Sequence, residues 1–185
     1  MQYSNLKNTP FSVLDLVPVV EGATRSDAIA RSLELAQHVE RLGYKRFWIS
    51  EHHNMESLAS ASPVLLISHI AEHTSRIRVG SGGVMLPNHA PLIVAEQFGT
   101  LATLFPDRID LGLGRAPGTD PRTAMALRRY QQETVQDFPN NIDELQLYLS
   151  EENSTGAVRA IPGEGLDIPL YLFHSQFYQF QLNQF

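Results

Sequence analysis

Three short polar clusters each follow an apolar run of the sequence. They are Glu51 to His53, Ser81 to Gly83, and the pair Gly114 and Arg115. Taken singly, each could be an ordinary solvated turn. If the apolar runs are parallel strands, however, their carboxyl ends share one rim, and the three clusters line a single pocket there. Their common placement favours a functional site.

The imidazoles and carboxylate of the first cluster raise the possibility of a metal centre. Glu51, His52 and His53 could act as ligands, with His89 completing the set. Adjacent histidines on a strand point to opposite faces, however, and cannot easily share one ion. No carboxylate stands at the exit of the fourth strand. We therefore expect no metal site.

Two other chemistries fit the sequence poorly. The chain has no cysteine, and Gly80 to Gly83 is only a weak match to a nucleophile elbow. The glycines of Gly112 to Gly118 miss the spacing of a dinucleotide fingerprint, and Pro117 lies where a helix N-terminus should donate N–H groups. Neither a nucleophilic hydrolase nor a Rossmann site is indicated.

The elements that must position these clusters recur roughly every 30 residues, the length of one strand–helix–strand repeat. A clear helix follows the first strand: Thr24 is its expected N-cap, with Asp27 three residues on, and Gly43 lies at its expected C-cap. Further helices are expected from 62 to 74, 91 to 105, 121 to 136 and 142 to 149. Strands are expected near residues 12–18, 46–50, 77–82, 109–113 and 168–172.

Repeated βα units with apolar strands predict a parallel sheet covered by helices, either a barrel or an open doubly wound sheet. We expect an α/β fold of the (β/α)8 TIM-barrel type, shortened to about the first five strands. A full barrel needs about 250 residues, and the chain has 185. More than fifty residues separate Gly114 from the next apolar run, which predicts a long loop on the fourth unit.

Composition narrows the class of protein further. With 43% hydrophobic residues, the chain is long enough for one domain and short for two. A net charge of −6 without a Lys/Arg run argues against nucleic-acid binding. No apolar stretch reaches the ~20 residues of a membrane helix, and the absence of a secretory signal pattern favours the cytoplasm.

Four motifs in order resemble the bacterial-luciferase-like, flavin-dependent monooxygenases. They are ISEHHN at 49–54, VGSGGVMLPNHAP at 79–91, Glu96-Gln97, and PDRIDLGLGRAPGTD at 106–120. Each is unspecific alone, but the ordered set is specific, and the resemblance covers about Lys7 to Leu172. It implies a barrel enzyme that uses reduced FMN, delivered by a separate flavin reductase, and O₂ to oxygenate a small organic substrate. The sequence does not name that substrate.

The resemblance also assigns residues. His52 matches the active-site histidine of the family and is the expected catalytic residue; Glu51 precedes it in the same motif. Gly82-Gly83 matches a non-prolyl cis peptide under the flavin ring, and Arg115 matches an arginine beside the flavin or its phosphate. In the turn after the fifth strand, Ser175 keeps a phosphate-binding role. Glu51, Gly82, Gly83, Arg115 and Ser175 are thus the expected cofactor-binding residues.

The last thirteen residues depart from the family pattern. Residues 1–172 form the expected monooxygenase domain, whereas 173–185 read FHSQFYQFQLNQF, almost all aromatic and glutamine. This tail is either an amphipathic closing segment or the product of an interrupted gene. It is too short for a sixth βα unit, so its aromatics should cover a sheet edge or join an interface between copies. We expect a homo-oligomer, and a catalytically silent flavin-binding or dimerising protein is the alternative function.

Overall fold

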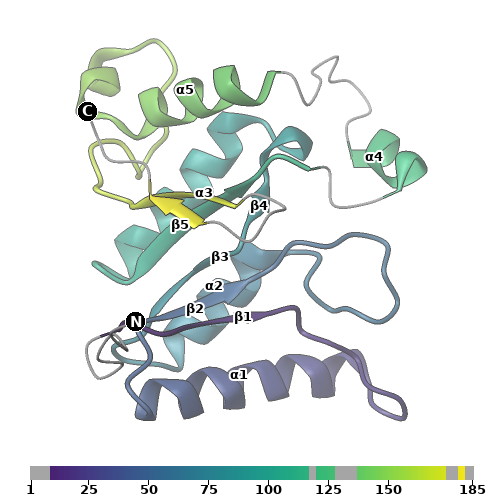
Figure 1. The fold of residues 1–185 in the computed structure, drawn as a ribbon. Helices are drawn as coiled ribbons and strands as arrows, with labels where there is room; N and C mark the ends of the chain where they lie inside the picture. The colour runs from purple at the N-terminus through teal and green to yellow at the C-terminus, as the bar shows by residue number, and fades with distance from the viewer. Residues whose placement is uncertain (1–8, 117–119, 128–136, 174–178, 182–185) are drawn as a thin grey trace, which may run out of the picture.

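The computed structural model describes residues 9–116, 120–127, 137–173 and 179–181. One curved sheet runs through them, in the order β1-β2-β3-β5-β6-β7, with β4 paired to β5 (Figure 1). All pairs are parallel except β6 with β7. The strands are β1 (Ser12–Asp15), β2 (Arg46–Ile49), β3 (Arg78–Ser81), β4 (Val84–Met85), β5 (Ile109–Gly114), β6 (Leu170–Phe173) and β7 (Gln179–Gln181).

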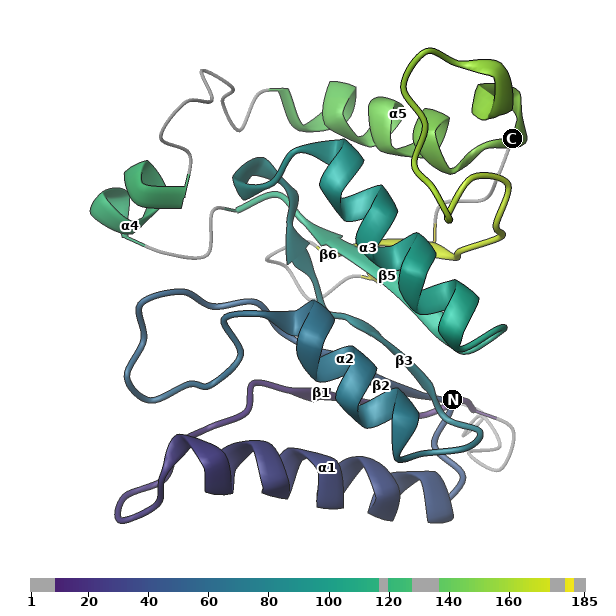
Figure 2. The same ribbon diagram turned by 180° about the vertical axis from the view of Figure 1, so that it is seen from behind.

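Helices cover one face of this sheet. From behind, α2 and α3 lie in front of the strands, with α1 along one side (Figure 2). The apolar core fills the layer between helices and strands and includes Phe47, Ile67 and Phe98, all fully buried. The helices are α1 (Arg25–Arg41), α2 (Pro63–Glu72), α3 (Pro91–Leu104), α4 (Pro121–Leu127) and α5 (Phe138–Leu149), with short 3-10 turns at Leu86–Asn88 and Glu151–Thr155.

The first helix forms where its capping residues predict it. Thr24 Oγ1 accepts a hydrogen bond from Asp27 N at 3.1 Å, and the Asp27 carboxylate accepts one from Thr24 N at 2.8 Å. At the other end Gly43 has a φ of +80°, which glycine adopts without a Cβ penalty. The expected parallel order of the five main strands is confirmed as well.

Several expected boundaries were wrong. β1 stops at Asp15, because the Asp15 carboxylate accepts the Val17 N–H at 2.9 Å and Val17 turns to a φ of +53°. The expected strand at 77–82 ends at Ser81, and the chain pairs again only at β4. α5 begins at Phe138, four residues before the expected start. Of the helix expected at 121–136, α4 covers 121–127, and 128–136 lie outside the described residues.

Large aromatic rings and glycines share the inner face of the sheet. The Trp48 ring lies 5.2 Å from that of Tyr171 and 5.3 Å from that of Phe173, although β3 and β5 separate their strands. The intervening strands leave room because they carry glycine: a Cβ on Gly80 would come within 2.7 Å of the Trp48 ring, and one on Gly112 would overlap Phe173. The packing of the Trp48 ring and the absence of side chains at Gly80 and Gly112 together allow the sheet to curve.

A charged network ties the amino ends of the strands together. Asp110 is fully buried and pairs with Arg46 Nε at 3.0 Å and with Arg78 Nη2 at 2.7 Å. Arg46 also donates to the Tyr171 hydroxyl. The hydrogen bond to Asp110 raises the pKa of the Arg78 guanidinium, against the opposing effect of burial. One carboxylate therefore joins β2, β3 and β5, and through Tyr171 also β6.

Replacing this carboxylate tests its contribution to stability. We expect Asp110→Asn to lower the free energy of unfolding by about 3 kcal/mol, because it leaves two partly buried guanidinium groups without a counter-charge. Chemical denaturation at neutral pH measures the change. The matched control is Asp143→Asn, an exposed site on α5 away from the network, where the change should stay within about 0.5 kcal/mol. Equal effects of the two variants would contradict the network's role.

The segment after β6 turns back on the sheet. β7 lies antiparallel to β6, with Leu172 opposite Phe180. The strand of a sixth βα unit would be parallel, so residues 179–181 do not form that strand. They pair instead with the outer edge of β6.

Across the described ranges, no helix is both long enough and apolar enough to cross a membrane.

Candidate functional site

The strand register brings the three polar clusters to one end of the sheet. Ile49 is paired with Ser81, and Met85 with Gly114. Gly82 N also donates to Ile49 O at 2.7 Å. The segments that follow β2, β3 and β5 therefore leave the sheet at the same rim, on the right in Figure 1. The expectation that Glu51, Gly82 and Arg115 share a rim is confirmed.

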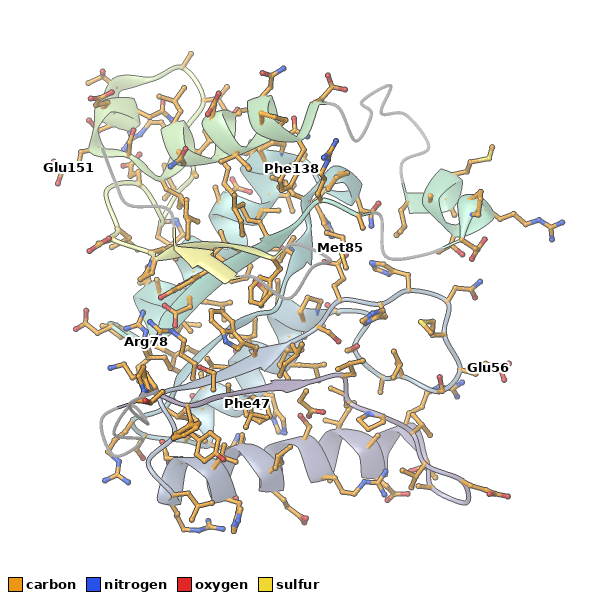
Figure 3. All side chains as sticks on the ribbon, viewed as in Figure 1. Phe47, Glu56, Arg78, Met85, Phe138 and Glu151 are labelled. Atoms are coloured by element: carbon orange, nitrogen blue, oxygen red, sulfur yellow. The ribbon has the colours of Figure 1, made fainter. Side chains whose placement is uncertain are left out.

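Glu51 is enclosed at the centre of this rim. Only 1% of its surface is exposed. Its Oε1 accepts hydrogen bonds from His53 Nε2 and His89 Nε2, both at 2.7 Å, and its Oε2 accepts one from Met85 N at 2.9 Å. Figure 3 labels Met85 at this end of the sheet and Arg78 toward the other. Because the Glu51 carboxylate is buried behind His53, His89 and β4, it would act on a bound ligand only by orienting these groups.

The hydrogen bonds keep the Glu51 carboxylate ionised. Burial acts to raise the pKa of the Glu51 carboxyl, but His89, His53 and the Met85 N–H together outweigh it, so the pKa lies below its ordinary value. A carboxylate that accepts several donors is favoured in its charged form. The rim therefore holds a fixed negative charge at its centre at neutral pH.

Glu51, His53 and His89 also place three ligand atoms within 4.8 Å of one another, a donor set that zinc or iron could use. The sequence argument correctly separated the adjacent histidines, since His52 faces Ser50 and His53 faces Glu51. It discounted the convergence with His89, 38 residues away. The Glu51 carboxylate already accepts hydrogen bonds from His53, His89 and Met85 N, and these bonds hold the arrangement together without an ion.

His52 lies on the rim beside this cluster and is partly exposed. Its Nδ1 is 3.1 Å from Ser50 Oγ, which is itself 3.1 Å from Ser60 Oγ. Burial lowers the pKa of the His52 imidazole; the charge of Glu51 opposes this effect, and that of His53 adds to it. The ring is accordingly neutral at pH 7 and can accept a proton.

The backbone after β3 carries no side chains. The Gly82-Gly83 peptide is cis, as expected from the resemblance. A Cβ on Gly82 would come within 2.8 Å of Leu14 and 2.9 Å of Trp48, and one on Gly83 within 2.8 Å of Gly112 O. Only glycine fits at both positions. Gly83 is buried and Gly82 partly exposed, so Gly82 presents backbone without a side chain on the same rim as His52, where a planar ring system could approach it.

The third segment of the rim follows β5. Arg115 is exposed there. Asn54, in the loop after β2, donates to Asp120 at 3.4 Å, and hydrogen bonds from the Thr123 side chain and backbone lower the pKa of Asp120 to about 2. This contact joins the loops after β2 and β5. Ser175, the remaining expected site residue, lies outside the described residues.

The folded-state pKa of Glu51 predicts a pH-dependent stability. Because that pKa is lowered, its stabilisation is present above the ordinary carboxyl value and is lost as the pH falls through the folded value. We expect Glu51→Gln to reduce the free energy of unfolding by about 2 kcal/mol at pH 7, and by progressively less as the pH falls below the ordinary carboxyl value. Denaturation curves across this pH range measure it. The exposed Glu56→Gln is the control and should show neither effect.

The pKa of His52 can be measured directly. In a proton NMR titration, its ring should titrate below the value of about 6.5 typical of exposed histidine. Comparison with His52→Ala assigns the resonance. A midpoint at or above about 6.5 would contradict the lowered pKa of His52, and a midpoint above about 7 would also contradict a neutral imidazole at pH 7.

The fold has parallel strands with helices outside, and polar groups gather at the carboxyl ends of its strands. This arrangement is that of the (β/α)-barrel class of proteins. Residues 9–168 match the family model described as Luciferase-like monooxygenase, and the chain belongs to this family. It is 50% identical over 176 residues to the luciferase-like monooxygenase of Escherichia coli K12, covering 95% of this chain and 52% of that relative. The chain spans about half the length of the curated relatives it matches.

Solved structures also match this chain over about half of their own length. Apo-MsnO8 superposes with a TM-score of 0.81 at 42% identity, over 88% of this chain and 49% of that one. The oxygenating constituent of 3,6-diketocamphane monooxygenase from Pseudomonas putida, in complex with FMN, superposes with a TM-score of 0.65 at 16% identity. The match covers 95% of this chain and 44% of that one. An F420-dependent secondary alcohol dehydrogenase superposes with a TM-score of 0.66, also at 16% identity, over 89% of this chain and 52% of that one. The fold is the N-terminal part of a luciferase-like TIM barrel, as expected.

Proposed function

We propose that this chain carries the flavin-facing rim of an FMN-dependent, luciferase-like monooxygenase that oxygenates a small organic substrate. One observation carries the proposal: the partly exposed Gly82, whose backbone carries no side chain, lies on the same rim as the neutral, partly exposed His52. Closely approachable backbone beside a proton acceptor suits a planar redox cofactor. When bound, reduced FMN supplies the electrons for oxygen activation, which no side chain here can provide.

Each residue then has a distinct task. The backbone of Gly82 forms the surface against which the ring packs, and Gly83, buried against Gly112 of β5, holds that backbone in place. His52 Nδ1 lies against Ser50, so its Nε2 is the atom that exchanges a proton with a bound group. The exposed guanidinium of Arg115 neutralises phosphate or flavin charge, together with Ser175. Glu51 fixes His53, His89 and Met85, and so holds the strand ends in register.

FMN is the cofactor we favour. The FMN complex and the F420 enzyme share only the fold with this chain, so the fold does not choose between the two. The curated relative at 50% identity bears the name of a monooxygenase, which favours FMN delivered in reduced form by a separate reductase. F420 should therefore bind more weakly than FMN.

A second candidate is a flavin-binding or dimerising protein without turnover. The described residues supply one side of the rim, whereas a closed, dry site needs walls all round. Binding and turnover must therefore be measured separately.

Flavin titration and a reductase-coupled oxidation assay test the proposal. FMN should bind, and Arg115→Ala should weaken binding about tenfold through loss of a charge-assisted contact, whereas the exposed Arg122→Ala should not. His52→Ala should keep binding and abolish substrate oxidation. Binding without turnover in the unmodified chain would support the second candidate. Absence of binding to both FMN and F420 would refute the cofactor assignment altogether.

A further inference from the structure

Two buried serine hydroxyls lie behind the His52 ring. His52 Nδ1 is 3.1 Å from Ser50 Oγ, and Ser50 Oγ is 3.1 Å from Ser60 Oγ. Ser60 is fully buried, and only 3% of Ser50 is exposed. The backbone N–H of His52 also donates to Ser60 O at 3.2 Å. Both the ring and the backbone of His52 are therefore tied to the loop that carries Ser60.

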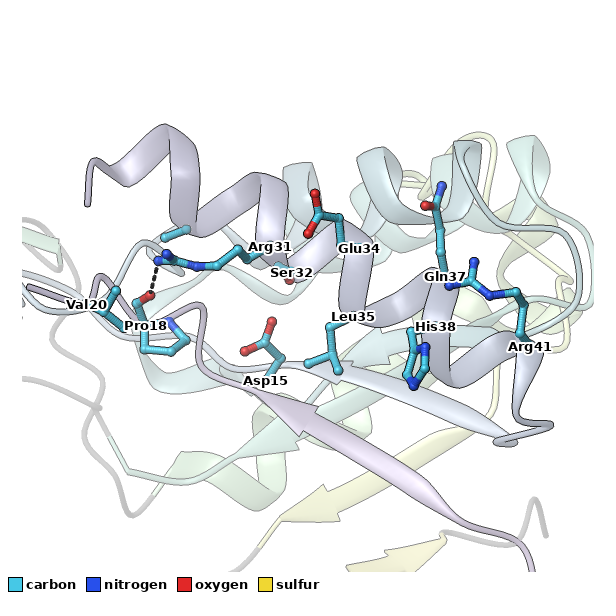
Figure 4. Close-up of a pocket in the computed structure, with 11 residues that line it drawn as sticks. Asp15, Pro18, Val20, Arg31, Ser32, Glu34, Leu35, Gln37, His38 and Arg41 are labelled. Atoms are coloured by element: carbon cyan, nitrogen blue, oxygen red, sulfur yellow. Dashed lines mark hydrogen bonds between the residues drawn. The ribbon is translucent and has the colours of Figure 1, made fainter. Parts of the chain in front are cut away.

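The turn that follows β1 fixes this loop. The Ser50 N–H donates to Asp15 O at 3.1 Å, and the Ala59 N–H donates to Val17 O at 3.0 Å. Asp15 begins the turn and lines the groove between β1 and α1 (Figure 4). One turn thus holds the residue before Ser60 as well as Ser50 itself. All of these contacts lie within residues 15–60, so the hydroxyl pair is complete in this part of the chain.

The number of hydrogens in this chain of hydroxyls favours one direction for its hydrogen bonds. Each serine hydroxyl has one hydrogen to donate. If Ser60 donates to Ser50 and Ser50 donates to His52 Nδ1, both buried hydrogens have an acceptor.

The opposite direction leaves one hydrogen without an acceptor. His52 Nδ1–H would then donate to Ser50 and Ser50 to Ser60, but Ser60 Oγ has no other hydrogen-bond partner among the described residues. Because Ser60 is fully buried, water cannot reach it from outside to accept the hydrogen. A buried donor without an acceptor is costly. The hydrogen bonds therefore run from Ser60 to Ser50 to His52.

We propose that Ser50 and Ser60 are positioning residues that keep the proton of the neutral His52 ring on Nε2 and leave Nδ1 as the acceptor. Nε2 makes no hydrogen bond within the described part of the chain, so it is the nitrogen that meets a ligand. The resting ring then acts as a hydrogen-bond donor. Nε2 can accept a proton from a bound group only after the ring's own proton has moved to Nδ1 and both hydroxyls have turned round.

The consequence for catalysis rests on the proposed function. An N–H group fixed on the rim stabilises negative charge on an oxygen atom beside it. A bare Nε2 in the same place would repel that oxygen. The hydroxyl pair therefore makes His52 favour ligands that present a carbonyl or negatively charged oxygen.

The position of the proton can be read in the unmodified chain, without flavin. In isotopically labelled histidine, a ring nitrogen that carries a proton resonates well apart from a bare one, and comparison with His52→Ala assigns the signals. At about pH 8, where imidazole is neutral, His52 should show a protonated Nε2 and a bare Nδ1. A protonated Nδ1, or the tautomer mixture of an unconstrained imidazole, would overturn the proposal.

Two alanine variants test the hydroxyl pair. Ser50→Ala removes the hydroxyl against Nδ1, so His52 should change from one tautomer to a mixture. Ser60→Ala should keep the proton on Nε2, because the Ser50 hydrogen still has Nδ1 as its acceptor. An unchanged spectrum in Ser50→Ala, or a shift of the proton to Nδ1 in Ser60→Ala, would refute the inferred direction.

The matched control is Ser62→Ala. Ser62 is exposed, and its side chain makes no capping hydrogen bond at the start of α2, so the His52 spectrum should not change. Circular dichroism verifies that each variant is folded.

The reductase-coupled assay separates this inference from the proposed function. If both hold, Ser50→Ala should lower substrate oxidation about tenfold, because the ring is no longer held in one tautomer, and should leave FMN affinity unchanged. A chain that shows the protonated Nε2 but binds no FMN would support the positioning by Ser50 and Ser60 and refute the proposed function. A chain that oxidises substrate with a protonated Nδ1 would do the reverse.

Discussion

The packing of the Trp48 ring across two glycine-bearing strands is the constraint on which the shape of the sheet depends. Trp48 contacts Tyr171 and Phe173, which lie three strands away in the sheet. That contact requires strong curvature, and curvature requires empty positions at Gly80 and Gly112. A Cβ at either position would push the ring away and flatten the sheet. The packing on the inner face thus supports the barrel-like curvature of the sheet.

The same use of glycine continues to the rim. Gly82 packs against Trp48, so the residue that shapes the sheet also supports the surface proposed for the flavin. On the far side of the rim, Glu51 draws His53, His89 and Met85 N onto one carboxylate. Asp110 plays the corresponding part at the amino ends, with Arg46 and Arg78. Two buried carboxylates, one at each end, hold the central strands in register.

Local signals made much of the fold predictable. The capping box at Thr24, the glycine at position 43 and the strand–helix repeat placed α1 and the five main strands in their observed order. The sequence could not predict β4 or β7, because strands of two or three residues form only where a neighbour offers a partner. The extent of β1 was missed because its end depends on the Asp15 side chain turning back to Val17 N.

The site was predictable to a similar degree. The strand ends placed Glu51, Gly82 and Arg115 on one rim, since parallel strands share their direction. The partnership of Glu51 with His89 spans 38 residues and has no local signature, so His89 appeared in the sequence only as a possible metal ligand. Burial of the Glu51 carboxylate depends equally on tertiary packing. The sequence therefore located the rim. It did not show which polar groups of the rim are exposed and which are buried and hold it together.

The rim is built by β2, β3, β4 and β5, the interior strands, and neither edge of the sheet contributes to its charged cluster. The residues that hold a ligand are thus fixed independently of what covers β1 or β6. Water exclusion is a different requirement, because the described elements stand on one side of the rim. In the proposed function, a flavin would contact the Gly82 backbone and His52 on this side of the rim, and its other side would need further walls. The proposed binding and the proposed turnover therefore make different demands on the structure, since binding needs contacts on one side and turnover also needs water to be excluded.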